Sequence, residues 1–137
     1  MKLRIVRAGL FAILIFVFAP FLAGCGGSSK TNTEPSLTVT TTPAINTVQA
    51  PALGPTFPLN VTVTSTMPPK GVTISVKATV DGSANSFFTT SKSTTVKSND
   101  FTISGQQIAD ENVVTITVTS NGTASNTWTG SYRYSAK

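Results

Sequence analysis

Cys25 carries the strongest nucleophile of this 137-residue chain, and it is the only cysteine. A thiolate attacks carbon and sulfur centres readily, so Cys25 is the natural acceptor for a covalent modification. Three basic side chains lie in residues 1–7, an apolar run fills residues 8–21, and Leu22-Ala23-Gly24 separates that run from Cys25. A positive start, an apolar stretch and small residues at a junction are typical of a cleavable export signal.

Leu22, Ala23, Gly24 and Cys25 resemble the lipobox of bacterial lipoproteins. The resemblance implies cleavage after Gly24, a diacylglyceryl group on the Cys25 sulfur, and a further fatty acid such as palmitate on the new amino terminus. Two or more acyl chains hold a protein stably on a membrane without spanning it. Because Gly26 follows Cys25, and not aspartate, the family's sorting rule implies the outer membrane of a host that has two.

An uncleaved amino-terminal anchor is the alternative to this leader. Residues 8–24 reach about 17 residues, the shortest apolar helix that spans a bilayer. Pro20 near the end of the run and the flexible Gly26-Gly27-Ser28-Ser29 segment favour the cleaved leader.

An aromatic row near the carboxyl terminus offers a second kind of chemistry. Trp128, Tyr132 and Tyr134 share one parity, with Gly130 between them, so on a regular strand they project from one face. On an open face the three rings could stack against sugars and form a glycan-binding site. On a closed face they supply core packing, which we favour because a small domain without disulfides needs large apolar groups.

The residue inventory argues against catalysis. Histidine is absent, and no serine lies in a Gly-x-Ser-x-Gly turn, so a hydroxyl nucleophile would lack its usual base. Asp110 and Glu111 are adjacent, and on extended chain their side chains point to opposite faces. We expect both in the loop before a strand that starts at Asn112. The chain is therefore predicted not to be an enzyme, and no cofactor is expected.

Metal and nucleic-acid binding are not expected either. Asp81 with Asn85, and Asn99 with Asp100, form two short oxygen-bearing pairs without the dense ligand ladder of a calcium loop, so turn formation explains them. The formal charge of +5 falls to about +2 once the leader is removed, and the remaining cations are scattered. A basic stripe for nucleic acid is missing.

Alternation of apolar and polar residues predicts β-strands in the rest of the chain, and no stretch after the leader favours a long helix. Proline clusters and the Asp81-Gly82 and Asn121-Gly122 pairs separate the strands. Phe87-Phe88 is interpreted as one core ring and one ring that covers a sheet edge. The alternating or strand-like stretches are residues 37–40, 59–64, 72–80, 101–103, 112–120 and 122–136.

This pattern predicts an all-β fold of about seven strands in a single antiparallel sandwich. Between Leu37 and Tyr134 it resembles the immunoglobulin-like or fibronectin-type-III-like domains of bacterial surface proteins. We therefore expect a signal peptide in residues 1–24, a lipidated cysteine with a flexible linker in 25–36, and the sandwich in 37–137.

Three functions are consistent with this organisation. The one we favour is a non-enzymatic envelope lipoprotein whose Ig-like module has a structural or protein-interaction role, an expectation that depends on fold analogy. The second is a carbohydrate-binding module that uses Trp128, Tyr132 and Tyr134. The third is a pilus-type subunit that exchanges either the strand at Leu37 or the last strand between copies.

Overall fold

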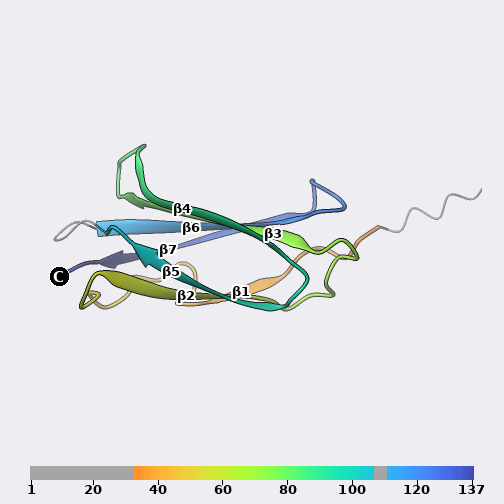
Figure 1. Cartoon of the computed structure of the whole chain (residues 1–137), viewed down its shortest axis with the longest axis horizontal. Coiled ribbons are helices and arrows are strands. Elements are labelled where there is room, and N and C mark those ends of the chain that lie inside the picture. The colour runs from red at the N-terminus through yellow and green to blue at the C-terminus, as the bar shows by residue number, and fades with distance from the viewer. Residues whose placement is uncertain (1–32, 107–110) are drawn as a thin grey trace, which may run out of the picture. The chain divides into compact units, whose positions relative to one another are not determined.

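β-branched residues that alternate with threonine and serine produce the strands of the fold, as expected for chain with one buried and one exposed face. The computed structural model describes residues 33–106 and 111–137, within the unit Asn32–Lys137. Figure 1 shows its seven strands. They are β1 (Val39–Thr42), β2 (Thr56–Val63), β3 (Val72–Val80), β4 (Ser86–Thr94), β5 (Ser98–Ser104), β6 (Glu111–Ser120) and β7 (Thr127–Ser135).

The strands form two antiparallel sheets that pack as a sandwich. One sheet has the order β1-β2-β5 and the other has the order β4-β3-β6-β7. This confirms the predicted all-β, Ig-like sandwich of about seven strands. In constant-type immunoglobulin domains the fourth strand joins the first, second and fifth. Here β4 pairs with β3 instead, so the sheets have three and four strands.

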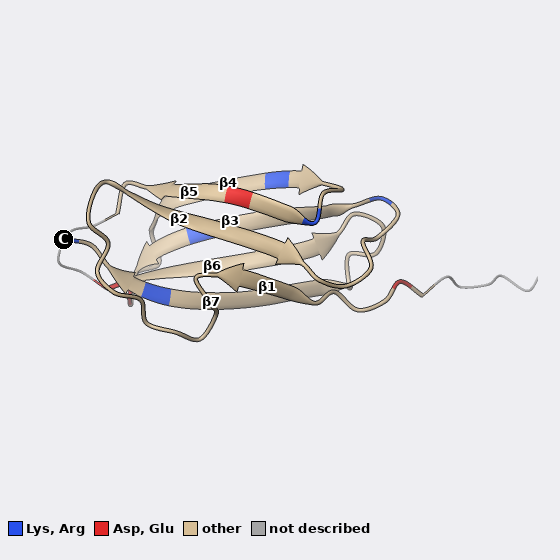
Figure 2. Cartoon of the chain, turned by 90° about the horizontal axis from the view of Figure 1, so that it is seen from below, with Lys and Arg blue, Asp and Glu red and all other residues tan. Residues whose placement is uncertain are grey.

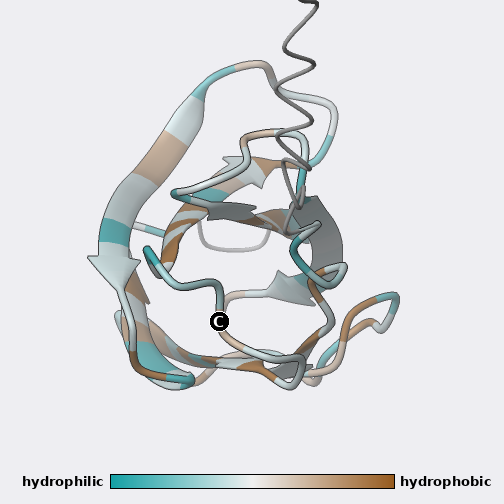
Figure 3. Ribbon diagram, turned by 90° about the vertical axis from the view of Figure 1, so that its right-hand side faces the viewer, coloured by the Kyte–Doolittle hydropathy of each residue, from teal (hydrophilic) through white to brown (hydrophobic). Residues whose placement is uncertain are grey.

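The core lies between the two inward faces. Along β3, Val72, Ile74 and Val76 are completely buried while Thr73 and Ser75 between them are half-buried on the outer face. Figure 3 looks along the strands and shows this alternation of apolar and polar residues. Each buried Val, Leu or Ile side chain contributes about 1.5–3 kcal/mol. The other large aliphatic side chains that are fully buried are Leu59, Val61, Val63, Ile103, Val114, Ile116 and Val118.

The two predicted turns differ in structure. Gly82 adopts a φ of 74° in the β3–β4 connection, the left-handed conformation that Asp-Gly pairs favour. The β6–β7 connection takes in residues 121–126 and is longer than a two-residue hairpin turn. Its ends are joined by the Ser120 amide, which donates to the Asn126 carbonyl over 3.0 Å. The longer loop frees the Asn121 and Asn126 side chains for contacts with other segments.

The chain changes sheets after β1. Beyond Thr42 it leaves β2 and runs parallel to β7, where the amides of Asn46, Gln49 and Ala52 donate to carbonyls of β7 over 2.7–2.8 Å. These bonds occupy the outer edge of β7, which an exchanged strand would otherwise use. At the opposite edge of this sheet, β4 pairs only with β3 among the described strands.

Candidate functional site

The aromatic row predicted near the carboxyl terminus lies on the inner face of β7. Tyr132 is 1% exposed and Tyr134 is 0% exposed, while Trp128 is half-buried against the core. Phe57 of β2 packs against both tyrosines, with its ring centroid 4.2 Å from that of Tyr134 and 6.0 Å from that of Tyr132. The two tyrosines are therefore core residues and cannot offer ring faces to a sugar, so the exposed three-ring platform considered from the sequence is not formed.

Gly130 makes room for the tryptophan. A Cβ atom at this position would lie 2.6 Å from the Trp128 ring and 2.7 Å from the Ile45 side chain, which is closer than real Cβ contacts. Without that atom the indole can lie over the β7 backbone and close this side of the core. Glycine is thus needed here for close approach and not for backbone conformation.

The two tyrosine hydroxyls have different surroundings. The Tyr134 hydroxyl donates to Gln106 Oε1 over 3.2 Å. The Tyr132 hydroxyl is buried without a hydrogen-bond partner among the described residues. Burial raises the pKa of Tyr134 to about 12, and burial together with the nearby Tyr134 raises the pKa of Tyr132 further. Both phenols stay neutral near pH 7 and cannot serve as bases there.

Glu34 and Pro35 form a polar cluster with Ser120 and Asn126 at the start of the described chain. The sequence did not predict this cluster, because both residues were expected in the flexible linker. The Ser120 hydroxyl donates to Glu34 Oε2 over 2.6 Å. The Asn126 side chain donates to the Pro35 carbonyl over 3.1 Å, and it accepts from the Leu37 amide over 3.0 Å. The hydrogen bond from Ser120 lowers the pKa of the Glu34 carboxyl below its ordinary value of 4.5. These bonds attach the entry of the chain to the β6–β7 loop.

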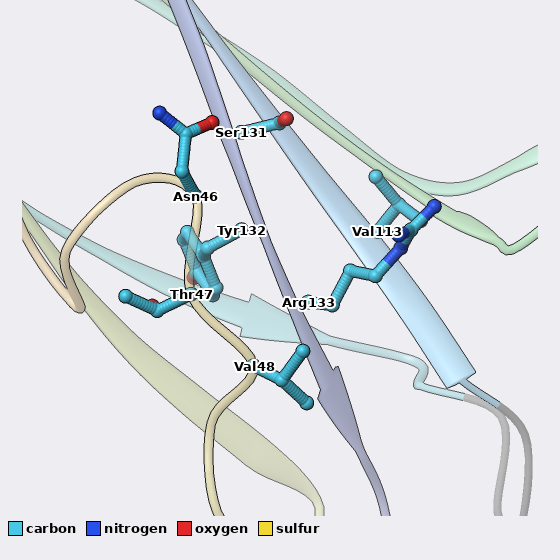
Figure 4. Close-up of a pocket in the computed structure, with 7 residues that line it drawn as sticks. All are labelled: Asn46, Thr47, Val48, Val113, Ser131, Tyr132 and Arg133. Carbon is cyan, nitrogen blue, oxygen red and sulfur yellow. The ribbon is translucent and has the colours of Figure 1, made fainter.

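A pocket of about 340 Å³ lies where segment 46–48 runs beside β7. Figure 4 shows Val113, Ser131 and Arg133 around it, with Arg133 extended over the outer face of the sheet. The Arg133 guanidinium contacts Asp81 Oδ1 at 3.2 Å and Glu111 Oε1 at 3.7 Å. These two contacts link β7 to the end of β3 and to the start of β6. Because two carboxylates already share the charge of Arg133, the residue is a weak site for an anionic ligand.

Three of the four side chains considered as calcium ligands, those of Asp81, Asn99 and Asp100, contact other residues. Asp81 contacts Arg133, and Asp100 accepts from Asn60 over 2.7 Å on the outer face of its sheet. The neighbouring Asn99 is buried and donates to the Val96 carbonyl over 2.8 Å. Within residues 33–106 and 111–137, no three side chains of His, Cys, Asp or Glu gather as metal ligands do.

The remaining sequence candidates have mixed outcomes. Glu111 is the first residue of β6, where it pairs with Ser135 of β7. The prediction that Glu111 lies in the preceding loop is therefore wrong. Asp110 lies outside the described residues. Phe87 and Phe88 are both half-buried and pack against the core beside the irregularity opposite Ala78 and Thr79. Leu22, Ala23, Gly24 and Cys25 also lie outside the described residues.

Fold and packing together define a seven-stranded, Ig-like β-sandwich. In the part of the chain that is described, no helix has the length and apolar character needed to cross a bilayer. Comparison with protein-family models gave no match, and no curated protein matches the chain.

Proposed function

We propose that this chain is a lipid-anchored protein of the bacterial envelope whose Ig-like sandwich has a structural or protein-interaction role. The observation that carries the proposal is the Leu22-Ala23-Gly24-Cys25 sequence at the end of an apolar leader. Acylation of Cys25 would retain the domain at a membrane surface, and Gly26 at the next position favours the outer membrane where the host has one.

The chemistry of the side chains supports binding over catalysis. The sequence has no histidine, and the phenols of Tyr132 and Tyr134 are buried and neutral. Arg133 is already paired with carboxylates. General acid–base catalysis needs a group that exchanges protons near the working pH, and these residues do not provide one. We therefore assign the protein a non-enzymatic role.

The exposed edge of β4 is the contact surface we favour for a protein partner. The β7 edge is covered by the amides of segment 46–52, whereas β4 pairs only with β3 among the described strands. β4 is nine residues long, contains no proline, and has Lys92 as its one charged residue. An unpaired edge of this kind accepts an extended segment of another protein as an additional strand.

Mass spectrometry of the mature amino terminus tests the anchor. The wild-type protein should begin at Cys25, carry acyl chains and fractionate with membranes. Cys25→Ser should abolish acylation and processing and release the anchor, while the matched substitution Ser28→Ala in the linker should change neither. A Cys25→Ser protein that is still processed and membrane-bound as in wild type would overturn the proposal.

A further inference from the structure

One end of the sandwich contains both the entry of the chain and three connecting loops. Glu34 and Pro35 bond to Ser120 and Asn126 there. The loops are residues 64–71 between β2 and β3, 95–97 between β4 and β5, and 121–126 between β6 and β7. Figures 1 and 2 place the carboxyl terminus at the opposite end. We call the end of the sandwich that contains Glu34 and these three loops the entry end.

Hydrogen bonds join the loops of the entry end into one surface. Asn121 is at the centre: its amide donates to the Gly71 carbonyl over 3.0 Å, and its side chain donates to the Lys70 carbonyl over 3.1 Å and to Ser93 Oγ over 2.8 Å. The Val63 amide donates to the Lys97 carbonyl over 2.9 Å. The backbones of Lys70 and Lys97 are therefore fixed before any partner binds.

The entry end is basic and has an apolar tip. Lys70 and Lys97 are exposed, Lys92 is exposed two residues before the end of β4, and Val96 beside Lys97 is 62% exposed. Figure 2 shows the blue positions of this end. Two acidic groups lie here: Glu34, which accepts hydrogen bonds and attracts Lys70, and Asp100, the third residue of β5. The entry end therefore has three lysines and two carboxylates among the described residues, an excess of one positive charge.

We propose that the entry end, through Lys70, Lys92, Lys97 and Val96, docks on the anionic headgroups of the membrane that holds the chain. This inference depends on the proposed lipid anchor at Cys25. Residues 26–33 separate Cys25 from Glu34, and eight residues span at most about 30 Å. The anchor thus keeps the entry end near the bilayer, where each lysine close to an anionic surface favours docking by about fivefold.

Docking at the entry end gives the domain a defined orientation. The opposite end contains residues 53–55 before β2, in which Leu53 is 87% exposed, and the β3–β4 connection at residues 81–85. These loops would point away from the lipid. The β4 edge would stand upright from the membrane, open along its length to a partner in the surrounding space.

Lysine labelling on vesicles tests the orientation. The mature acylated protein is added to preformed phosphatidylcholine vesicles, with or without phosphatidylglycerol, and treated with a membrane-impermeant amine reagent. Mass spectrometry then gives the extent of labelling at each lysine. On the anionic vesicles, labelling of Lys70 and Lys97 should fall several-fold, while Lys77 and Lys137 should label equally on both. High salt should restore labelling of Lys70 and Lys97, because it screens surface charge.

Paired variants separate charge at the entry end from total charge. A K92Q/K97Q variant should increase labelling of Lys70 on anionic vesicles, with docking weakened by about fivefold for each lysine removed. The matched K77Q/K137Q variant should leave the protection of Lys70 and Lys97 intact. Equal labelling of Lys70 and Lys97 on both vesicle types, in protein whose acyl mass is present, would overturn the inference and leave the anchor standing. Protein that lacks the acyl mass would overturn both.

Discussion

The rings of Phe57 and Tyr134 stack, with centroids 4.2 Å apart and planes inclined by 20°. Phe57 belongs to β2 in the three-stranded sheet and Tyr134 to β7 in the four-stranded sheet, so the contact joins the two layers of the sandwich. No cysteine pair is available to link the sheets, because the chain has one cysteine. Aromatic packing therefore supplies part of the cohesion that disulfides give to small secreted domains.

Replacing Phe57 with leucine should lower the free energy of unfolding by about 1–2 kcal/mol. The substitution keeps an apolar side chain and removes the ring stacking, which contributes about 0.5–1.5 kcal/mol beyond burial. Urea unfolding followed by Trp128 emission measures the change. Val113→Ala, on the outer face of β6, is the control and should cost less. Equal losses for both variants would contradict a special role for the stacked pair.

The two tyrosine hydroxyls should respond differently to removal. Tyr134→Phe deletes the hydrogen bond to Gln106 and should destabilise the fold by about 1 kcal/mol. Tyr132→Phe removes a buried hydroxyl without a partner among the described residues, and it should leave stability unchanged or raise it by up to about 1 kcal/mol. Denaturant unfolding of both variants gives the comparison. A larger loss for Tyr132→Phe than for Tyr134→Phe would show that the Tyr132 hydroxyl has a partner in solution.

Alkaline titration should report on the core directly, because Tyr132 and Tyr134 are the two tyrosines of the chain. Their pKa values are raised above the ordinary 10.0, to about 12 for Tyr134. The two phenols make their full contribution to the free energy of unfolding below pH 10, where they are neutral. This contribution is lost as the pH rises through the folded-state pKa values. Tyrosinate absorbance should therefore rise together with unfolding, as followed by circular dichroism. A titration centred near pH 10 in folded protein would contradict this burial.

Glu34 should make stability depend on pH in the acid range. Its carboxyl pKa lies below 4.5, chiefly because the Ser120 hydroxyl donates to it. The stabilisation is present above the unfolded-state pKa and is lost as pH falls through the folded-state value. Wild type should melt at a higher temperature than Glu34→Gln at pH 7, and the difference should shrink below about pH 4.5. A difference that stays constant across this range would argue against the charged hydrogen bond.

Gly71 and Gly82 form a matched pair for testing the entry end. Both have a φ of 74°, so alanine costs about 1–2 kcal/mol of backbone strain at either position. A Cβ at Gly82 would meet nothing within 4 Å, whereas at Gly71 it would clash with the Thr94 carbonyl oxygen. Gly71→Ala should therefore destabilise the domain by at least about 1 kcal/mol more than Gly82→Ala. Thermal unfolding of the two variants would test this, and equal losses would contradict the close approach of Gly71 to the end of β4.

Strand placement could be predicted from the sequence because period-two alternation is a local property. The runs that contain Val72 to Val80 and Asn112 to Ser120 each show it without reference to any other segment. The parity of Trp128, Tyr132 and Tyr134 likewise placed them on one face. The side to which that face turns depends on the opposing sheet, so burial of the tyrosines needed Phe57 and its strand in place.

By itself, the sequence determined the all-β class, the approximate number of strands and the leader-like residues before Cys25, since each depends on patterns within a short stretch of chain. The tertiary structure decided which strands pair, why β7 has a covered edge, and how Glu34 becomes attached to Ser120. Those features join residues far apart in the chain. They depend on how the two sheets pack around one core, and the local alternation of apolar and polar residues does not specify that packing.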